Sequence, residues 1–143
     1  RAIGLTAQMA GPLATQDLIT VGGEAANGFF DIGIAVNPET TDARARQFIE
    51  KFRARFGDVP PWFSGTMYEA TYLLRDLVAA TAKAGGNPRS AEALAKTLLA
   101  NPEFPNYLAG GTIRFLPDHS VSRTLAVRRV EAGKFQIAKF VEP

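Results

Sequence analysis

Cysteine is absent from the 143 residues, and histidine occurs once, as His119. The absence of cysteine excludes disulfides, thiolate nucleophiles and cysteine-ligated metal sites. A single histidine with scattered carboxylates does not supply the clustered ligands that a metal site needs. His119 falls in a predicted turn, and a Ser/His/Asp triad would need distant partners, so an exposed turn histidine is the favoured interpretation. We therefore predict no enzyme, no cofactor and no metal.

Charge of one sign is also scarce, because 16 basic residues stand against 14 acidic ones and leave a net charge of +2. No block of Lys and Arg appears beyond Arg128–Arg129 and four spaced arginines on one predicted helix, so no nucleic-acid partner is expected. No apolar run reaches the roughly 18–20 residues that span a bilayer, and no signal peptide is recognised. The chain begins with Arg1 rather than Met, from which we expect a processed or truncated product.

What the sequence does contain is the composition of a globular domain, with 46% hydrophobic and 21% charged residues. Helical periodicity and glycine stops predict one short and three longer helices, and alternation predicts strands near both ends. The predicted helices cover residues 13–21, 41–56, 64–84 and 90–99. The predicted strands cover residues 1–7, 28–36, 112–115, 124–131 and 134–141, the last two joined as a hairpin by Ala132–Gly133.

Local signals set the ends and faces of these elements. Gly11–Pro12 is expected to end the first strand. Thr40 or Thr41 is expected to cap the predicted helix over residues 41–56. Strand 28–36 carries few charges and is expected to be buried on both faces. The predicted inward faces of the last two helices consist of Met67, Ala70, Leu73, Leu74, Leu77, Val78 and Ala82, and of Ala91, Leu94, Leu98 and Leu99.

Helices dominate the middle of the chain and strands both ends, which favours an α/β fold. The parallel sheet of an α/β fold needs more strands than this chain supplies. The apolar strand 28–36 also needs a neighbour on each edge. The sequence therefore indicates either a second chain that completes the sheet or a piece of a larger protein.

Two stretches are candidates for binding a small molecule. Glu24 follows Gly22–Gly23 and precedes a buried strand, and a carboxylate in such a loop can face a ligand. The alternative is a helix-ending glycine pair with a solvated acid. Trp62, Phe63, Tyr68 and Tyr72 lie around a Pro–Pro entry into a helix and can wall a pocket. The alternative is that Phe63 staples the helix start and the tyrosines lie at the core edge.

Four blocks, in order and spacing, resemble a known family. They are residues 23–28 before a buried strand, residues 45–60, residues 68–74, and residues 110–115 leading to 133–135. Together they resemble the C-terminal part of type 1 periplasmic binding proteins, the leucine/isoleucine/valine-binding class that serves ABC importers. The likeness extends over nearly the whole chain.

The resemblance implies a partial two-lobed α/β fold in which the chain crosses between lobes at a hinge. Residues 1–38 would belong to the second lobe, residues 39–120 to the first, and residues 121–143 to the hinge crossing and a second-lobe hairpin. A missing N-terminal half of the same protein would hold most of the first lobe's sheet. His119 departs from the glycine usual at its turn in the family.

The resemblance also implies the site. Glu24 matches the position that receives the ligand ammonium, Phe63 matches an aromatic that precedes the Thr-x-Tyr helix start, and Met9 is a looser match in a loop facing the cleft. The expected function is capture of a small organic solute by hinge closure, in the periplasm or at a lipid anchor outside the cell membrane. An ABC permease would be the partner. Alternatives are a ligand-sensing domain of a regulator or receptor, a binder of aromatic acids, and a small self-contained enzyme.

Overall fold

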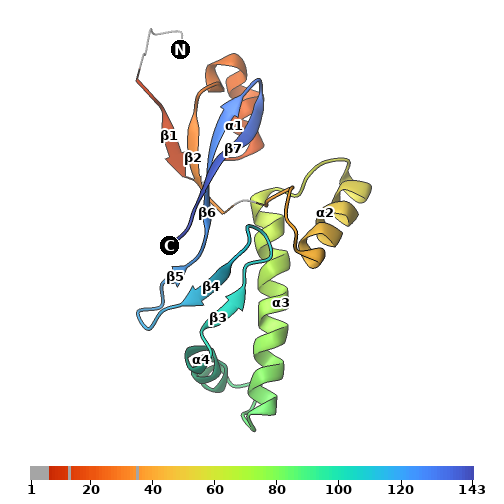
Figure 1. The fold of residues 1–143 in the computed structure, drawn as a ribbon, viewed down its shortest axis with the longest axis vertical. Coiled ribbons are helices and arrows are strands. Elements are labelled where there is room, and N and C mark those ends of the chain that lie inside the picture. The colour runs from red at the N-terminus through yellow and green to blue at the C-terminus, as the bar shows by residue number, and fades with distance from the viewer. Residues whose placement is uncertain (1–6, 13, 35) are drawn as a thin grey trace. The chain divides into compact units, whose positions relative to one another are not determined.

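The computed structural model describes residues 7–12, 14–34 and 36–143, and their contacts divide the chain into two compact units (Figure 1). Unit 1 consists of residues 1–35 and 125–142, whereas unit 2 consists of residues 36–124 with the terminal Pro143. The chain therefore passes from unit 1 to unit 2 after residue 35 and returns after residue 124.

Unit 1 is built on a four-stranded sheet with the order β1-β2-β6-β7. Strand β1 is parallel to β2, and the other pairs are antiparallel. Its elements are β1 (Ala10–Pro12), α1 (Gln16–Gly22), the 3-10 helix η1 (Gly23–Ala26), β2 (Phe30–Gly33), β6 (Leu125–Glu131) and β7 (Lys134–Val141). Its core is the cluster Ile19, Ala26 and Val130, against which Leu18, Phe29 and Phe135 pack.

The start of unit 1 differs from the sequence prediction. Residues 1–6 of the predicted first strand, and Leu13 at the predicted helix start, lie outside the described residues. Gly11 and Pro12 do not break a strand but belong to β1, which lies at the edge of the sheet. Proline is tolerated there because an edge strand leaves one row of N–H positions unpaired. Helix α1 ends at the Gly22–Gly23 pair, as predicted.

Strand β2 is shorter than predicted, and it is not buried on both faces as expected. Asp31 is buried, with 2% of its surface exposed, while the neighbouring Ile32 is 48% exposed. The prediction that this strand is apolar and buried on both faces was therefore wrong. The reason is that Asp31 lies directly opposite Arg128 of β6 and pairs with it, so a charge occupies the inward position. The predicted neighbours on both edges are present, as β1 and β6.

Unit 2 is mainly helical with a small antiparallel sheet of order β3-β4-β5. Its elements are α2 (Ala43–Phe56), α3 (Trp62–Lys83), α4 (Ala91–Ala100), β3 (Glu103–Pro105), β4 (Thr112–Phe115) and β5 (Val121–Ser122). The long helix α3 is green in Figure 1, and α4 packs against it. Strand β4 and the hairpin of β6 and β7 confirm the sequence prediction, whereas the short strands β3 and β5 were not predicted.

Helix caps in unit 2 follow the predicted chemistry with one correction. Asp42, rather than Thr40 or Thr41, is the N-cap of α2, and its Oδ1 accepts a 2.8 Å hydrogen bond from the Ala45 N–H. The Thr40 hydroxyl instead accepts from the Asp42 N–H at 3.2 Å. Ser90 caps α4, and Gly57, with a φ of 78°, ends α2.

The predicted inward face of α3 is only partly correct. Leu77 is buried, but Met67, Leu74 and Val78 are 64%, 53% and 36% exposed. Gly65, Glu69 and Thr81 are the other buried positions of the helix. Glu69 can lie inward because it is ion-paired, and the Thr81 hydroxyl donates to the Leu77 carbonyl at 2.9 Å. On α4, Ala91 and Leu99 are exposed rather than inward.

Candidate functional site

Glu24 lies in η1, between α1 and β2, with its side chain exposed. Gly23 before it has a φ of 51° and caps α1, its N–H donating to the Ile19 carbonyl. The helix-ending glycine and the exposed carboxylate therefore lie side by side in the chain, and the expected loop is the 3-10 helix η1. A hollow of about 330 Å³ adjoins it, lined by Ile19, Gly23, Glu24, Asn27, Ala132 and Gly133. The Glu24 carboxylate therefore borders this hollow.

Met9 lies in the same unit as Glu24. It is half-buried and immediately precedes β1, and its carbonyl accepts a 3.0 Å hydrogen bond from the Phe30 N–H. The 3-10 helix that carries Glu24 ends shortly before β2, and the Phe29 N–H donates to the Ala26 carbonyl at 3.0 Å. Met9 therefore lies beside the start of β2, whereas Glu24 precedes that strand in the chain by six positions.

Phe63 belongs to unit 2 and lies in the first turn of α3. The structure corrects the expected helix start, because Pro61 is the N-cap and both Trp62 and Phe63 are helical. The Phe63 ring is 49% exposed and meets the Trp62 ring edge-to-face, with centroids 5.9 Å apart. Such exposure disfavours a buried staple and leaves the ring available for a ligand or a partner.

The four aromatics around the Pro–Pro segment do not share one wall. Tyr68 stacks on Phe48 of α2 at 4.2 Å, and Tyr72 lies beneath the guanidinium of Arg44 at 4.8 Å. Burial and a hydrogen bond with Tyr72 raise the pKa of Tyr68 to about 12, so its hydroxyl stays protonated. The tyrosines line a groove of about 230 Å³ between α2 and α3, formed by Gln47, Phe48, Lys51, Phe52, Arg55, Phe56, Tyr68 and Tyr72. Trp62 and Phe63 are not part of that groove.

Two buried ion pairs were missed by sequence reasoning. In unit 1, Arg128 Nε and Nη2 lie 2.9 and 2.8 Å from Asp31 Oδ1. The second Asp31 oxygen accepts from the Ala14 N–H, and Arg128 Nη2 also donates to the Ala14 carbonyl at 3.1 Å. A single acid inside an apolar strand was the signal that could have revealed this pair.

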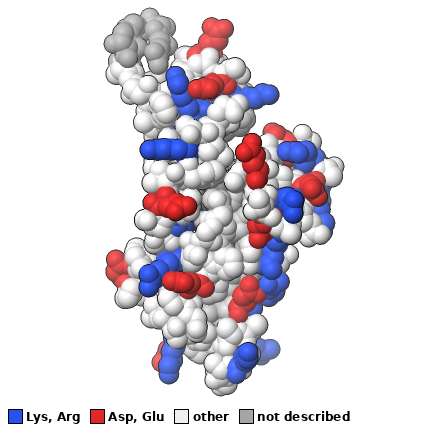
Figure 2. All heavy atoms as spheres, viewed as in Figure 1, with Lys and Arg blue, Asp and Glu red and all other residues white. Residues whose placement is uncertain are grey.

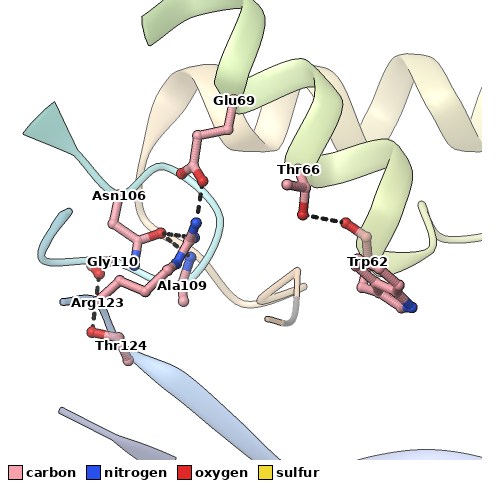
Figure 3. Close-up of polar contacts among 8 residues, drawn as sticks. All are labelled: Trp62, Thr66, Glu69, Asn106, Ala109, Gly110, Arg123 and Thr124. Carbon is pink, nitrogen blue, oxygen red and sulfur yellow. Dashed lines mark hydrogen bonds and ion pairs between the residues drawn. The ribbon is translucent and has the colours of Figure 1, made fainter. Parts of the chain in front are cut away.

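The second pair lies in unit 2, where Arg123 Nη2 is 2.9 Å from Glu69 Oε2 (Figure 3). The same nitrogen donates to Asn106 Oδ1 at 3.0 Å. Burial raises the pKa of Glu69, and the charge of Arg123 and its hydrogen bond oppose that rise. An acid at an inward helical position was the corresponding signal in the sequence.

The surface charge is mixed. Lys and Arg alternate with Asp and Glu over the face shown in Figure 2, and no block of one sign gathers there. Within the described ranges 7–12, 14–34 and 36–143, no helix is both long and apolar enough to cross a membrane. The same residues include no group of three or more side chains arranged to hold a metal ion.

Comparison with known proteins identifies the family to which this chain belongs. The family model described as periplasmic binding protein matches residues 1–134, and the chain belongs to that family. The family consists of solute-binding proteins, so the chain is part of a binding protein and not an enzyme, as predicted from the sequence. No curated protein sequence matches it significantly.

Solved structures show the same fold at low sequence identity. The leucine binding protein LivK from Thermotoga maritima is 21% identical, with a TM-score of 0.81 over 100% of this chain. LivJ from Streptococcus pneumoniae, solved with isoleucine, is 20% identical with a TM-score of 0.73 over 100% of this chain. A solute binding protein from R. palustris, solved with benzoate, is 21% identical with a TM-score of 0.65 over 88%. The chain spans 39%, 39% and 33% of those three proteins, so its fold is part of theirs.

Proposed function

We propose that this chain is the C-terminal part of a solute-binding protein that captures a small organic molecule for an ABC importer. The observation that carries the proposal is the family match over residues 1–134. A chain that crosses twice between compact units supports the two-lobed mechanism, in which ligand contacts from both lobes select the closed state. In this proposal unit 1 is part of the second lobe and unit 2 part of the first.

The proposed ligand contacts are Glu24 and Met9 from unit 1 and Phe63 from unit 2. The exposed Glu24 carboxylate would pair with an ammonium group, which favours an amino acid as the ligand. The exposed Phe63 ring would cover the apolar part of that ligand. The leucine and isoleucine in the names of two structural relatives are consistent with this choice.

Calorimetric titration of the complete protein with L-leucine, L-isoleucine and benzoate tests the proposal. Glu24→Gln should weaken binding of the amino acid by about 1–2 kcal/mol, or about tenfold, because a charge-assisted hydrogen bond is lost. Asp17→Asn, an exposed acid on α1, is the matched control and should leave affinity unchanged. Unaltered affinity in Glu24→Gln would remove Glu24 from the site.

A binder of aromatic acids is the second candidate, supported by the exposed Phe63 ring and by the benzoate in one related structure. The same titration separates the two. A carboxylate repels an anionic ligand, so Glu24→Gln should strengthen benzoate binding where it weakens amino-acid binding. The sign of the change therefore identifies the ligand class.

The exposed apolar face of α3 supports the proposal that a further part of the protein covers this chain. Phe63, Met67, Leu74 and Val78 follow helical spacing and are between 36% and 64% exposed. An exposed apolar stripe of this kind marks an interaction surface. We propose that the first lobe's sheet, from the missing N-terminal half, packs on it.

Mass spectrometry of the natural protein tests whether that further part exists. A covalently continuous protein, or a partner peptide of domain size that copurifies, would support it. A protein of only these 143 residues that binds solute with full affinity would overturn it. The proposed location is the periplasm or a lipid anchor outside the cell membrane, where the binding protein would deliver solute to the permease.

A further inference from the structure

The segments that join the two units leave unit 2 beside a single loop, residues 106–111. Asn37 follows the first crossing, and its N–H donates to the Leu108 carbonyl at 2.7 Å. Arg123 and Thr124 precede the second crossing. Arg123 Nη2 donates to Asn106 Oδ1 at 3.0 Å, and the Thr124 hydroxyl lies 3.5 Å from the Gly110 carbonyl (Figure 3). One loop thus holds the unit 2 ends of both crossings.

This loop is itself closed and firmly seated. The Asn106 N–H donates to the Gly111 carbonyl at 3.0 Å, and the Gly110 N–H donates to the Asn106 carbonyl at 2.9 Å. Asn106 Oδ1 also accepts from the Ala109 N–H at 3.3 Å. Leu108 is fully buried. Hydrogen bonds within the loop therefore determine its shape independently of its contacts with the two crossings.

Helix α3 provides the base on which the loop and the crossings rest. A Cβ atom on Gly65 would lie 2.6 Å from Val36 Cγ2 and 3.2 Å from Leu108 Cδ1, so helix, crossing and loop meet where only glycine fits. One turn further along, Glu69 Oε2 holds Arg123 at 2.9 Å. The side chains of Glu69 and Arg123 are 4% and 10% exposed, and water screens such a pair weakly.

We propose that residues 106–111 form an anchor loop that, with α3, binds both crossings so that they act as one pivot when the units move. Arg123 is a positioning residue in this arrangement. Its role is to hold the second crossing to unit 2, so that bending takes place beyond residue 124. The inference rests on the proposed function in that it assumes two lobes that move relative to one another.

The test measures the distance between the units in the complete, ligand-free protein. The 143 residues contain no cysteine, so spin labels can be attached at Glu92→Cys in unit 2 and Lys139→Cys in unit 1, both exposed positions. Double electron–electron resonance then reports the distribution of distances. Arg123→Met should broaden that distribution, because the second crossing gains freedom. Arg114→Met, which removes an exposed arginine of unit 2, should not.

The outcomes decide the inference separately from the proposed function. An unchanged distribution in folded Arg123→Met, or a parent distribution already as broad, would overturn it. If Arg123→Met fails to fold, Thr124→Val, which removes one hydroxyl at nearly constant volume, is measured in its place. It should also broaden the distance distribution, and an unchanged distribution would overturn the inference. A merely structural Arg123 would lower the melting temperature without altering the distribution. Because no ligand is used, failure of every solute to bind would sink the proposed function and leave this test standing.

Discussion

In the part of the chain that the structure describes, each unit contains one buried arginine–carboxylate pair, and the two pairs differ in how completely they are bonded. Asp31 engages both Nε and Nη2 of Arg128 and takes a further hydrogen bond from the Ala14 N–H. In unit 2 only Arg123 Nη2 is engaged by Glu69. Among the described residues, Glu69 Oε1, Arg123 Nε and Asn106 Nδ2 have no hydrogen-bond partner.

The difference shows what a buried ion pair contributes in each place. Bringing two charges out of water is costly, and the cost is repaid only when the remaining donors and acceptors are satisfied. The pair in unit 1 meets that condition and joins β2, β6 and the segment before α1. For the second pair, burial is the largest influence on the pKa of Glu69 and raises it, whereas the charge of Arg123 lowers it. We infer that the first pair stabilises its unit more than the second.

The largest effect should follow from removing Arg128. Arg128→Met leaves the Asp31 carboxylate buried without a counter-charge, which should reduce the free energy of unfolding by about 3–5 kcal/mol. Urea denaturation of the complete protein measures it. A loss below about 1 kcal/mol would end the claim that complete bonding makes this pair the stronger one.

Arg123→Met should reduce the free energy of unfolding by less, about 1–3 kcal/mol, because only a few hydrogen bonds to a charged group are lost. Glu69 can take up a proton more readily than an ordinary glutamate once Arg123 is gone, because its pKa is already raised. The same denaturation experiment compares the two variants directly. Equal losses in Arg123→Met and Arg128→Met would break the comparison between the units.

The pH dependence of stability should also distinguish the second pair. Because the pKa of Glu69 is raised above its ordinary value of 4.5, the folded protein holds this proton more tightly than the unfolded chain does. The associated stability is present below pH 4.5 and is lost as the pH rises through the folded pKa. The free energy of unfolding of the parent minus that of Glu69→Gln should therefore fall as the pH is raised from 4 to 8. A difference that stays constant or grows would contradict the direction of the shift.

The smallest effects are expected at two turns, one in each unit. Ala132 and His119 have positive φ values of 49° and 67°. Ala132→Asn creates an Asn–Gly pair in the two-residue hairpin loop and should raise stability by about 0.5–1 kcal/mol. His119→Asn should change little, because histidine itself tolerates the left-handed region better than alanine. Thermal unfolding of both variants measures the contrast, and a larger gain at His119 would reverse it.

Those elements that local signals determine could be predicted from the sequence. Helix α2 and helix α4 have their own caps and apolar periodicity, and the β6–β7 hairpin has its own turn. The glycines around Glu24 predicted the end of α1, but Glu24 lies in the 3-10 helix η1 and not in a loop. Strands β3 and β5, of three and two residues, are too short to show alternation.

The features that could not be predicted depend on distant partners. Asp31 is inward only because Arg128, 97 positions away, lies opposite it. Apolar periodicity predicted that the exposed face of α3 is buried. That pattern carries no information about the ion pair that allows Glu69 to lie inward. For the same reason, the roles of Glu24, Met9 and Phe63 as ligand contacts stay predictions until binding is measured.

The discontinuity of unit 1 imposes an order on biosynthesis. Residues 36–124 of unit 2 form one uninterrupted stretch, whereas β2 pairs with a strand that begins at Leu125. A ribosome must therefore complete the whole of that stretch before β2 meets β6. Until then, Asp31 has no arginine opposite it, and the strand remains an open edge. An unpaired strand edge can pair with another chain, so this nascent segment is open to aggregation until β6 has been made.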